Sequence, residues 1–236
     1  MQTYTNWELL LLDNASQDGS ADLAAEFQYR FGGTERLLWS SQPDTGIYDA
    51  WNRGLALARG SYLTFLGADD TFFDQHSLEN VAALVSTGAD LVTARNAYYA
   101  ADGRFLRHWG FCWQWKRMRQ SMNIAHPGML VSRKLFNLYG PFDSNFSICG
   151  DYEWFLRLPP DLRTVHTTDS VCKITQAGVS HTRIRKVYNE TFHAQRRHIG
   201  IFASAACWML NWAKCLCECR VADSAADPPS SGYRWR

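Results

Sequence analysis

The sequence predicts an α/β fold built on a mixed, mostly parallel sheet that is flanked by helices. Short apolar runs ending in polar residues alternate with amphipathic segments through residues 1–95. This alternation of strands and helices is typical of parallel sheets with helices packed on their faces. With 236 residues, 46% of them hydrophobic, the chain is long enough for one large domain or two small ones with a substantial core.

Four strands and three helices are expected in this first region. The strands are short apolar runs at residues 7–12, 36–39, 61–66 and 90–93. The helices carry apolar residues at helical spacing and are residues 19–31, 47–58 and 74–86. Gly54 lies inside the second helix, where glycine costs about 1 kcal/mol relative to alanine, so we expect the helix to approach the sheet closely there.

The pattern changes at about residue 96. A hairpin is expected around the turn Asp102-Gly103, with strands at residues 98–99 and 104–109. The other expected elements are strands at 128–131, 165–168 and 170–176, short helices at 133–139 and 151–158, and a long helix from 183 to about 219. We therefore expect a domain of residues 1–182 with halves at 1–95 and 96–182, a helical extension at 183–221, and a disordered tail at 222–236.

Charge and cysteine usage exclude several classes of protein. The 24 basic and 23 acidic residues nearly cancel, which argues against a basic nucleic-acid-binding protein and against an acidic disordered chain. The polar first residues do not form a signal peptide, so a reduced, cytoplasmic protein is expected despite seven cysteines. Cys215, Cys217 and Cys219 lack the usual spacing of zinc ligands and a second ligand pair, which disfavours a zinc site.

One apolar segment raises the question of a membrane. Residues 199–213 carry no charge, yet they fall short of the roughly 20 residues that a membrane-spanning helix needs. Two interpretations remain open for the helix at 183–221. It packs on the domain or on a second subunit as a dimer contact, or it lies in the membrane interface at the cytosolic face.

Adjacent acidic residues after the third strand point to cation chemistry. Asp69 and Asp70 follow the apolar run 61–66, and two neighbouring carboxylates are costly to ionise without a cation. Mg²⁺ or Mn²⁺ fits such a pair, since these ions bind through one or two carboxylates together with substrate phosphates. A solvated turn is the alternative.

Two further carboxylates occupy comparable positions. Asp13 follows the first strand and precedes a helix, which would place it beside a ribose or base, unless the segment is a helix cap formed by Ser16 or Asp18. Asp151 opens a later helix, where the helix dipole favours its ionised form and suits a general base. Glu153 competes for this role, and a simple N-cap is the alternative for Asp151.

Six short segments form an ordered set of motifs: residues 2–8 (QTYTNWE), 13–19 (DNASQDG), 44–54 (DTGIYDAWNRG), 58–62 (ARGSY), 68–70 (ADD) and 150–152 (GDY). In order and spacing, these segments resemble glycosyltransferase family 2. The resemblance implies a GT-A fold, a nucleoside-diphosphate-sugar donor and inversion at the anomeric carbon. It implies a UDP-, GDP- or dTDP-sugar as donor and a saccharide or lipid-linked acceptor, in polysaccharide or glycan biosynthesis.

The resemblance also implies roles for individual residues on the donor side. Asp13 matches the acid near the base or ribose, and Asp44 and Asn52 fall within a donor-side motif. Asp69 matches the last acid of the metal-binding Asp-x-Asp motif, and Asp70 matches the acid that often follows it. The first acid of that motif is Gly67 in this chain, which weakens the expected metal site.

On the acceptor side, the resemblance assigns one catalytic residue and three contacts. Asp151 matches the catalytic base, with Gly150 in place of the commoner glutamate. His126 precedes Pro127-Gly128 in a segment that flanks the acceptor in the family, and it is either a substrate contact or a histidine held in the core. Tyr152 and Glu153 are the other expected acceptor contacts.

The resemblance leaves open whether the chain is active. Family members carry about one strand and one helix before the segment that starts here at Gln2, so an N-terminal truncation is expected, with the loss of a central strand. An inactive remnant that at most binds nucleotide is therefore the alternative to an active transferase. A sugar nucleotidyltransferase is a third candidate, but it needs a glycine-rich phosphate loop near its start, and this sequence lacks one.

Overall fold

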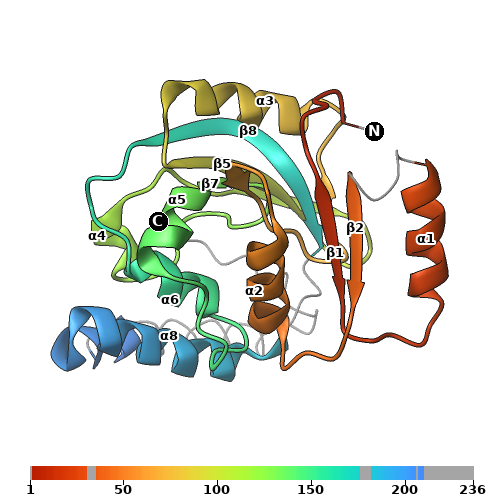
Figure 1. The fold of residues 1–236 in the computed structure, drawn as a ribbon. Coiled ribbons are helices and arrows are strands. Elements are labelled where there is room, and N and C mark those ends of the chain that lie inside the picture. The colour runs from red at the N-terminus through yellow and green to blue at the C-terminus, as the bar shows by residue number, and fades with distance from the viewer. Residues whose placement is uncertain (1, 31–35, 176–181, 206, 210–236) are drawn as a thin grey trace.

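A computed structural model describes residues 2–30, 36–175, 182–205 and 207–209. Its strands form two separate sheets (Figure 1). In the smaller sheet, β1 (Leu9–Asp13) pairs in parallel with β2 (Leu37–Ser41). Helix α1 (Ser20–Arg30) packs on β2, and α2 (Ile47–Leu57) packs on β1.

The larger sheet has the strand order β3-β7-β5-β8-β4, with β6 paired to β5. Its strands are β3 (Tyr62–Leu63), β4 (Thr71–Phe72), β5 (Leu91–Tyr99), β6 (Phe105–Trp109), β7 (Leu130–Ser132) and β8 (Thr164–Thr175). Among the six pairings of the described strands, β1–β2 and the long β5–β8 are parallel, and the four shorter pairings are antiparallel. The α/β class and the mixed sheet are confirmed. The expected hairpin around Asp102-Gly103 is confirmed as β5–β6.

Helices cover both faces of the larger sheet (Figure 1). Helix α3 (Ser77–Leu84), continued by a 3₁₀ turn at Val85–Thr87, lies on one face. The helices on the other side are α4 (Trp115–Met118), α5 (Arg133–Tyr139), α6 (Gly150–Leu156) and α8 (Ile184–Ile199). The expected close approach at Gly54 is confirmed, since a Cβ atom there would lie 2.8 Å from Leu12 Cδ1.

Several element boundaries differ from those expected. The run 61–66 forms a ladder only at Tyr62–Leu63, because its partner β7 is itself three residues long. The two strands expected at 165–168 and 170–176 form the single strand β8, whose irregularities appear as shifts in its register with β5. The helix expected from 183 is interrupted after Ile199, because Gly200 has a φ of 84° that breaks the helical backbone, and residues 201–205 and 207–209 are helical again.

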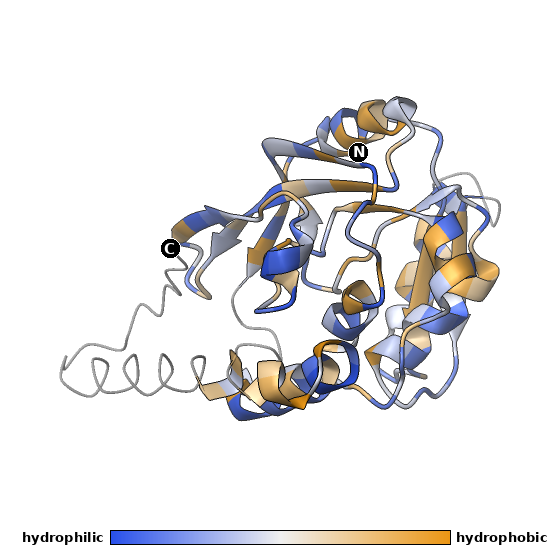
Figure 2. Cartoon of the chain, turned by 90° about the vertical axis from the view of Figure 1, so that its left-hand side faces the viewer, coloured by the Kyte–Doolittle hydropathy of each residue, from blue (hydrophilic) through white to orange (hydrophobic). Residues whose placement is uncertain are grey.

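Two apolar clusters hold the layers together. One lies between the larger sheet and α3 and contains Leu78, Val81, Val92 and Val171. The other lies below the sheet, where Tyr48 of α2, Phe136 of α5 and Trp154 of α6 meet Phe142 of the loop between α5 and α6. Hydrophobic and hydrophilic segments alternate along α8 (Figure 2), which buries Tyr188 and Ala194 against the rest of the protein.

Among the described residues, the helices are too short or too polar to cross a bilayer. The expected tail at 222–236, the end of the expected long helix and Cys215, Cys217 and Cys219 lie outside the described residues. The boundary expected at residue 182 stays a prediction, although α8 packs directly on α6.

Candidate active site

Asp13 lies at the end of β1, where neighbouring hydroxyl groups orient its carboxylate. Oδ1 accepts a hydrogen bond from Ser16 Oγ at 2.5 Å, and Oδ2 accepts from the Ser16 backbone N–H at 2.9 Å and from Ser41 Oγ at 2.6 Å. These bonds to Ser16 and Ser41 lower the pKa of Asp13 below its usual value. Asp13 is therefore an ionised acceptor group at the end of two parallel strands.

The loop after β2 is tied to the same end of the smaller sheet. Asn14 Oδ1 accepts the backbone N–H of Asp44 at 2.8 Å, and Asp44 Oδ1 accepts that of Gly46 at 3.0 Å. The other Asp44 oxygen lies 3.4 Å from Arg53 Nη2. The structure thus places Asp13 and Asp44 at the same end of the smaller sheet, where Asn14 joins their loops, and their role toward a donor stays a prediction.

Asn52 does not share this environment. Its side chain donates to the carbonyl oxygen of Phe142 at 2.9 Å and accepts the backbone N–H of Phe142 at 2.9 Å. Both polar ends of the amide are therefore engaged with one peptide backbone. In this geometry Asn52 joins α2 to the loop before α6, and its expected contact with the donor has no support.

Asp69 and Asp70 form a tight turn after the third apolar run. Asp70 Oδ2 accepts the Gly67 N–H at 2.9 Å, and the Asp70 N–H donates to the Gly67 carbonyl oxygen at 3.2 Å. Burial raises the pKa of Asp70, and the neighbouring charge of Asp69 raises it further. Asp69 is exposed at the same turn.

This turn has the chemistry of a divalent cation site that the substrate must complete. The two carboxylates are hard oxygen ligands, and a cation would relieve the repulsion between them. No group of three or more His, Cys, Asp or Glu side chains is placed to hold a metal in the part of the chain that the structure describes. Asp69 and Asp70 therefore fit Mg²⁺ or Mn²⁺ as a partial ligand set, with phosphate oxygens supplying other positions.

Asp151 opens α6, and long-range contacts surround its carboxylate. Oδ1 accepts the Tyr152 N–H at 2.8 Å and lies 3.1 Å from the Tyr48 hydroxyl, while His126 Nδ1 lies 3.3 Å from Oδ2. The Tyr48 hydroxyl also lies 2.6 Å from the Ile148 carbonyl oxygen, so its one hydrogen can go to either acceptor. The Asp151 side chain is 20% exposed, which leaves it accessible to a substrate.

Tyr48 and Gly150 pack directly against each other beside this carboxylate. A Cβ atom on residue 150 would lie 2.7 Å from Cε2 of the Tyr48 ring. Burial, followed by the charge of Asp151, raises the pKa of Tyr48 well above its usual value, so its hydroxyl stays protonated. The glycine that departs from the family pattern therefore makes room for a hydroxyl donor next to Asp151.

His126 sits in a box of aromatic rings. Its ring contacts Trp51, Phe65, Phe142 and Phe155 at centroid distances between 5.2 and 6.3 Å. Its side chain is 5% exposed, and Nε2 has no hydrogen-bond partner. His126 is thus a buried residue that faces Asp151, rather than an exposed acceptor contact. One of these rings, Phe65, belongs to the segment that continues to Asp69.

Tyr152 and Glu153 point away from the exposed side of Asp151. Tyr152 is 3% exposed, and its hydroxyl donates to the Met118 carbonyl oxygen at 2.6 Å. Glu153 is 1% exposed and lies 2.5 Å from Arg157 Nη2 and 2.8 Å from His198 Nε2. Their expected contacts with an acceptor have no support in this geometry, because both side chains are engaged in the interior.

Sequence reasoning missed the partners that orient the acids. The Ser41 hydroxyl binds Asp13, and the Tyr48 hydroxyl lies beside Asp151. The Glu190 carboxylate binds the backbone just before α6, the helix that bears Asp151. Tyr48 lies inside the donor-side motif 44–54, but the motif does not indicate that its hydroxyl lies beside Asp151. Nothing in the sequence connects Glu190 with residues 147–149.

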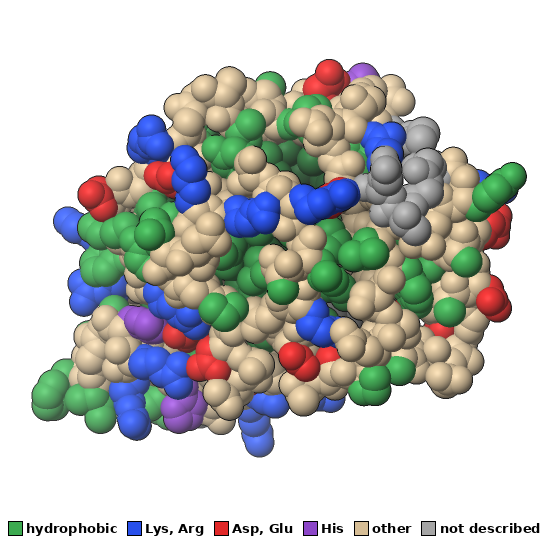
Figure 3. All heavy atoms as spheres, in the orientation of Figure 1, with side chains coloured by type: hydrophobic (Ala, Val, Ile, Leu, Met, Phe, Trp, Pro, Cys, Tyr) green, Lys and Arg blue, Asp and Glu red, His purple; other side chains and the backbone are tan. Residues whose placement is uncertain are grey.

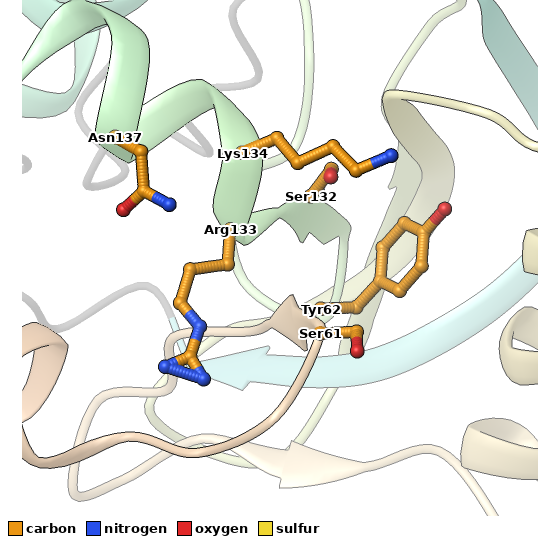
Figure 4. Close-up of a pocket in the computed structure, with 6 residues that line it drawn as sticks. All are labelled: Ser61, Tyr62, Ser132, Arg133, Lys134 and Asn137. Atoms are coloured by element: carbon orange, nitrogen blue, oxygen red, sulfur yellow. The ribbon is translucent and has the colours of Figure 1, made fainter.

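A shallow pocket lies apart from these acids, at the start of α5. It is lined by Ser61, Tyr62, Ser132, Arg133, Lys134 and Asn137 (Figure 4). Arg133 and Lys134 point in different directions, and the Arg133 guanidinium donates to the carbonyl oxygens of Ala58 and Arg59. The pocket contains none of the predicted site residues and is not a candidate for the reaction centre.

Solved structures define the fold class. The structure of residues 1–349 of S. aureus TarS with UDP matches 84% of this chain, at a TM-score of 0.61 and 16% identity. This chain spans 58% of that structure. The mannosyltransferase PcManGT of Pyrobaculum calidifontis, solved with GDP-Man and Mn²⁺, matches 97% of this chain and 70% of its own, with a TM-score of 0.61 and 16% identity. The protein has the GT-A fold of such glycosyltransferases.

Sequence comparison defines the family. The family model "Glycosyl transferase family 2" matches residues 1–134. A PGL/p-HBAD biosynthesis glycosyltransferase of Mycobacterium tuberculosis is 34% identical over 192 residues, which cover 79% of this chain and 73% of that protein. Glycosyltransferase AglE of Haloferax volcanii is 30% identical over 162 residues, or 66% of this chain and 53% of that protein. The chain belongs to glycosyltransferase family 2, whose members are transferases.

Proposed function

We propose that this protein transfers a sugar from a nucleoside-diphosphate donor to a hydroxyl group of a saccharide or lipid-linked acceptor, with inversion at the anomeric carbon. The observation that carries the proposal is the oriented, partly exposed carboxylate of Asp151 at the start of α6. A carboxylate held this way suits a general base. Family membership and relatives named as glycosyltransferases support the reaction class.

In the proposed step, an Asp151 oxygen takes the proton of the acceptor hydroxyl. The hydroxyl oxygen forms a bond to the anomeric carbon as the bond from that carbon to the donor's phosphate oxygen breaks. The electron pair leaves with the nucleoside diphosphate, and this single displacement inverts the configuration. His126 and Tyr48 hold the carboxylate in place during the transfer.

The donor is proposed to lie across the ends of β1 and β2 and the turn at Asp69 and Asp70. Asp13 offers an ionised oxygen to a ribose hydroxyl or a base N–H, as its position at the strand ends supports. A divalent cation bound by Asp69 and Asp70 would supply positive charge to the diphosphate leaving group. Neighbouring structures named with UDP, UDP-GlcNAc or GDP-Man support a nucleotide sugar without deciding the base.

The proposed biological role is glycan or polysaccharide synthesis. The relatives named as glycosyltransferases of PGL/p-HBAD biosynthesis support a role in a biosynthetic pathway. The cytoplasmic location and the contact of residues 183–221 with a membrane or a second subunit remain predictions.

The test is turnover of UDP-, GDP- and dTDP-sugars by the full chain with Mg²⁺ or Mn²⁺, for wild type and for Asp151→Asn. We expect the substitution to lower kcat by about 10²- to 10⁴-fold, the range of general-base contributions. Asp161→Asn removes an exposed carboxylate and is the matched control. Equal rates for wild type and Asp151→Asn would overturn the assignment of the base, and no turnover by the wild type would favour the inactive remnant.

A further inference from the structure

The end of the loop that leads into α6 is hydrogen-bonded to the carboxylate of Glu190 on α8. Glu190 Oε2 accepts the backbone N–H of Ile148 at 2.8 Å and that of Cys149 at 2.9 Å. Its Oε1 accepts the Ser147 hydroxyl at 2.7 Å and the Ser147 N–H at 3.1 Å. These three consecutive N–H groups precede α6 directly, where a helix has donors without intrahelical partners and favours negative charge.

Glu190 is built for this task. Its side chain is 12% exposed, and its pKa is lowered because bonds to Cys149, Ser147 and Ile148 outweigh the effect of burial. It is therefore ionised near neutral pH, when each of its oxygens can accept from several donors. A neutral amide of the same shape would offer one oxygen and would place an NH₂ group against backbone N–H groups.

Residues 147–149 are also bonded to Tyr48, the residue whose hydroxyl lies beside Asp151. The Ile148 carbonyl oxygen accepts from Tyr48, while the Ile148 N–H donates to Glu190. The peptides on the two sides of Ile148 are thus anchored to α2 and to α8. Asp151 follows three residues later, in the first turn of α6.

Other contacts between α8 and this region run in parallel. Arg197 Nη1 lies 2.6 Å from Asp143 Oδ2 in the loop before α6, and His198 Nε2 lies 2.8 Å from Glu153 Oε1 on α6 itself. Figure 3 shows His, Lys and Arg side chains gathered with acidic ones over the region of α8. Helix α8 therefore holds both the loop and the helix that bear Asp151.

We propose that Glu190 is a positioning residue for the catalytic base: its carboxylate fixes residues 147–149 and thereby the place of Asp151 in the transfer. This inference rests on the proposed function, in which Asp151 takes the proton of the acceptor. Glu190 touches neither the donor nor the acceptor in this scheme. Loss of the Glu190 carboxylate is therefore expected to lower the rate of transfer and to leave donor affinity unchanged.

The test compares Glu190→Gln with Glu8→Gln in the full chain. Glu8 is a matched control, because its carboxylate also accepts backbone N–H groups, those of Arg59 and Gly60 at 2.6 and 2.9 Å, and its side chain is 20% exposed. It precedes β1, at the end opposite Asp13. Both substitutions remove a charge and an N–H acceptor, but only Glu190 is linked to Asp151.

We expect Glu190→Gln to lower kcat per folded molecule by about 10- to 100-fold, the cost of a small misplacement of a reacting group. The donor KM should change by no more than about twofold, and Glu8→Gln should leave both constants near wild type. Backbone hydrogen exchange supplies a second measurement. Glu190→Gln should speed exchange at residues 147–149, and Glu8→Gln should speed it at residues 59–60 instead.

The outcomes separate this inference from the proposed function. If wild type transfers sugar and Asp151→Asn does not, while Glu190→Gln matches wild type in kcat or in exchange at residues 147–149, Glu190 is not a positioning residue and the function stands. Equal losses of kcat in Glu190→Gln and Glu8→Gln would reduce the effect to general stability and overturn the inference. If wild type itself transfers no sugar, the function and the inference fall together.

Discussion

The two sides of the candidate site are held in different ways. Asp13 and Asp70 are oriented mainly by nearby hydroxyl and N–H groups, and Asp13, Asp69 and Asp70 lie at strand ends and turns. Asp151 is surrounded by groups from distant parts of the chain, including His126 and Tyr48. In the proposed reaction a base must be in place before the transfer, whereas donor-side carboxylates would be ordered by the cation and the diphosphate that we propose they bind.

The largest effect is expected in the buried network beside the base. Glu153→Ala removes a carboxylate that is bonded to Arg157 and His198 and is 1% exposed. Breaking such a buried pair leaves the Arg157 guanidinium without its partner, and we expect the free energy of unfolding to fall by about 3 kcal/mol. Urea unfolding measures this change.

Glu79→Ala is the control for that experiment. Glu79 is a 53% exposed carboxylate on α3 that lies near Thr3 and His76. Its removal should cost no more than about 1 kcal/mol. If Glu153→Ala and Glu79→Ala lower the free energy of unfolding equally, the network around Glu153 contributes no more to stability than an exposed carboxylate does.

On the donor side, the double substitution Asp69→Ala, Asp70→Ala should act on the reaction and spare the fold. We expect kcat/KM for the nucleotide sugar to fall about 100-fold, since the cation that neutralises the leaving group loses its protein ligands. Stability should stay near wild type or rise, because burial and Asp69 already raise the pKa of Asp70. Activity titrated with Mn²⁺ measures the loss, with Asp161→Ala as control, and unchanged metal dependence would remove these residues from the donor site.

A smaller effect is expected from Tyr48→Phe, which keeps the ring and removes the hydroxyl beside Asp151. One neutral hydrogen bond is worth about 1 kcal/mol, so stability or kcat should fall by about that amount, or about fivefold in rate. Kinetic constants and urea unfolding of the same variant separate the two. No change in either would mean that His126 and the Tyr152 N–H hold Asp151 without Tyr48.

The smallest effect is a difference in pH dependence. The pKa of Glu153 is lowered, chiefly by bonds to His198 and Arg157 that outweigh burial, so its contribution is present above the unfolded value of 4.5 and is lost as pH falls through the folded pKa. The pKa of Asp70 is raised above 3.8 by burial, so its protonation favours the fold as pH falls. Unfolding free energy measured from pH 7 to 3 should therefore decline less steeply in Glu153→Gln and more steeply in Asp70→Asn. The reverse order would contradict these assignments.

The predictability of the site follows the same division. Asp13, Asp69 and Asp70 could be found from the sequence, since an acid after an apolar strand is a local pattern. The surroundings of Asp151 could not, because Tyr48 and His126 reach it, and Glu190 reaches residues 147–149 before it, only through tertiary packing. Likewise, the antiparallel pairings of the two-residue strands β3 and β4 leave no periodic signal, and Gly200 interrupts a stretch whose pattern predicts one continuous helix.

Because Tyr48 and Gly150 are in contact, the side chains that can be accommodated at positions 48 and 150 depend on each other. The space that a side chain at residue 150 would fill is already taken by the ring at residue 48. Engineering that returns an acidic residue to position 150 must therefore first shrink residue 48, and would exchange a hydroxyl donor for a second negative charge beside Asp151. A mutagenesis library of this protein should vary positions 48 and 150 together. If position 150 alone is varied, selection will only remove side chains that clash with the Tyr48 ring.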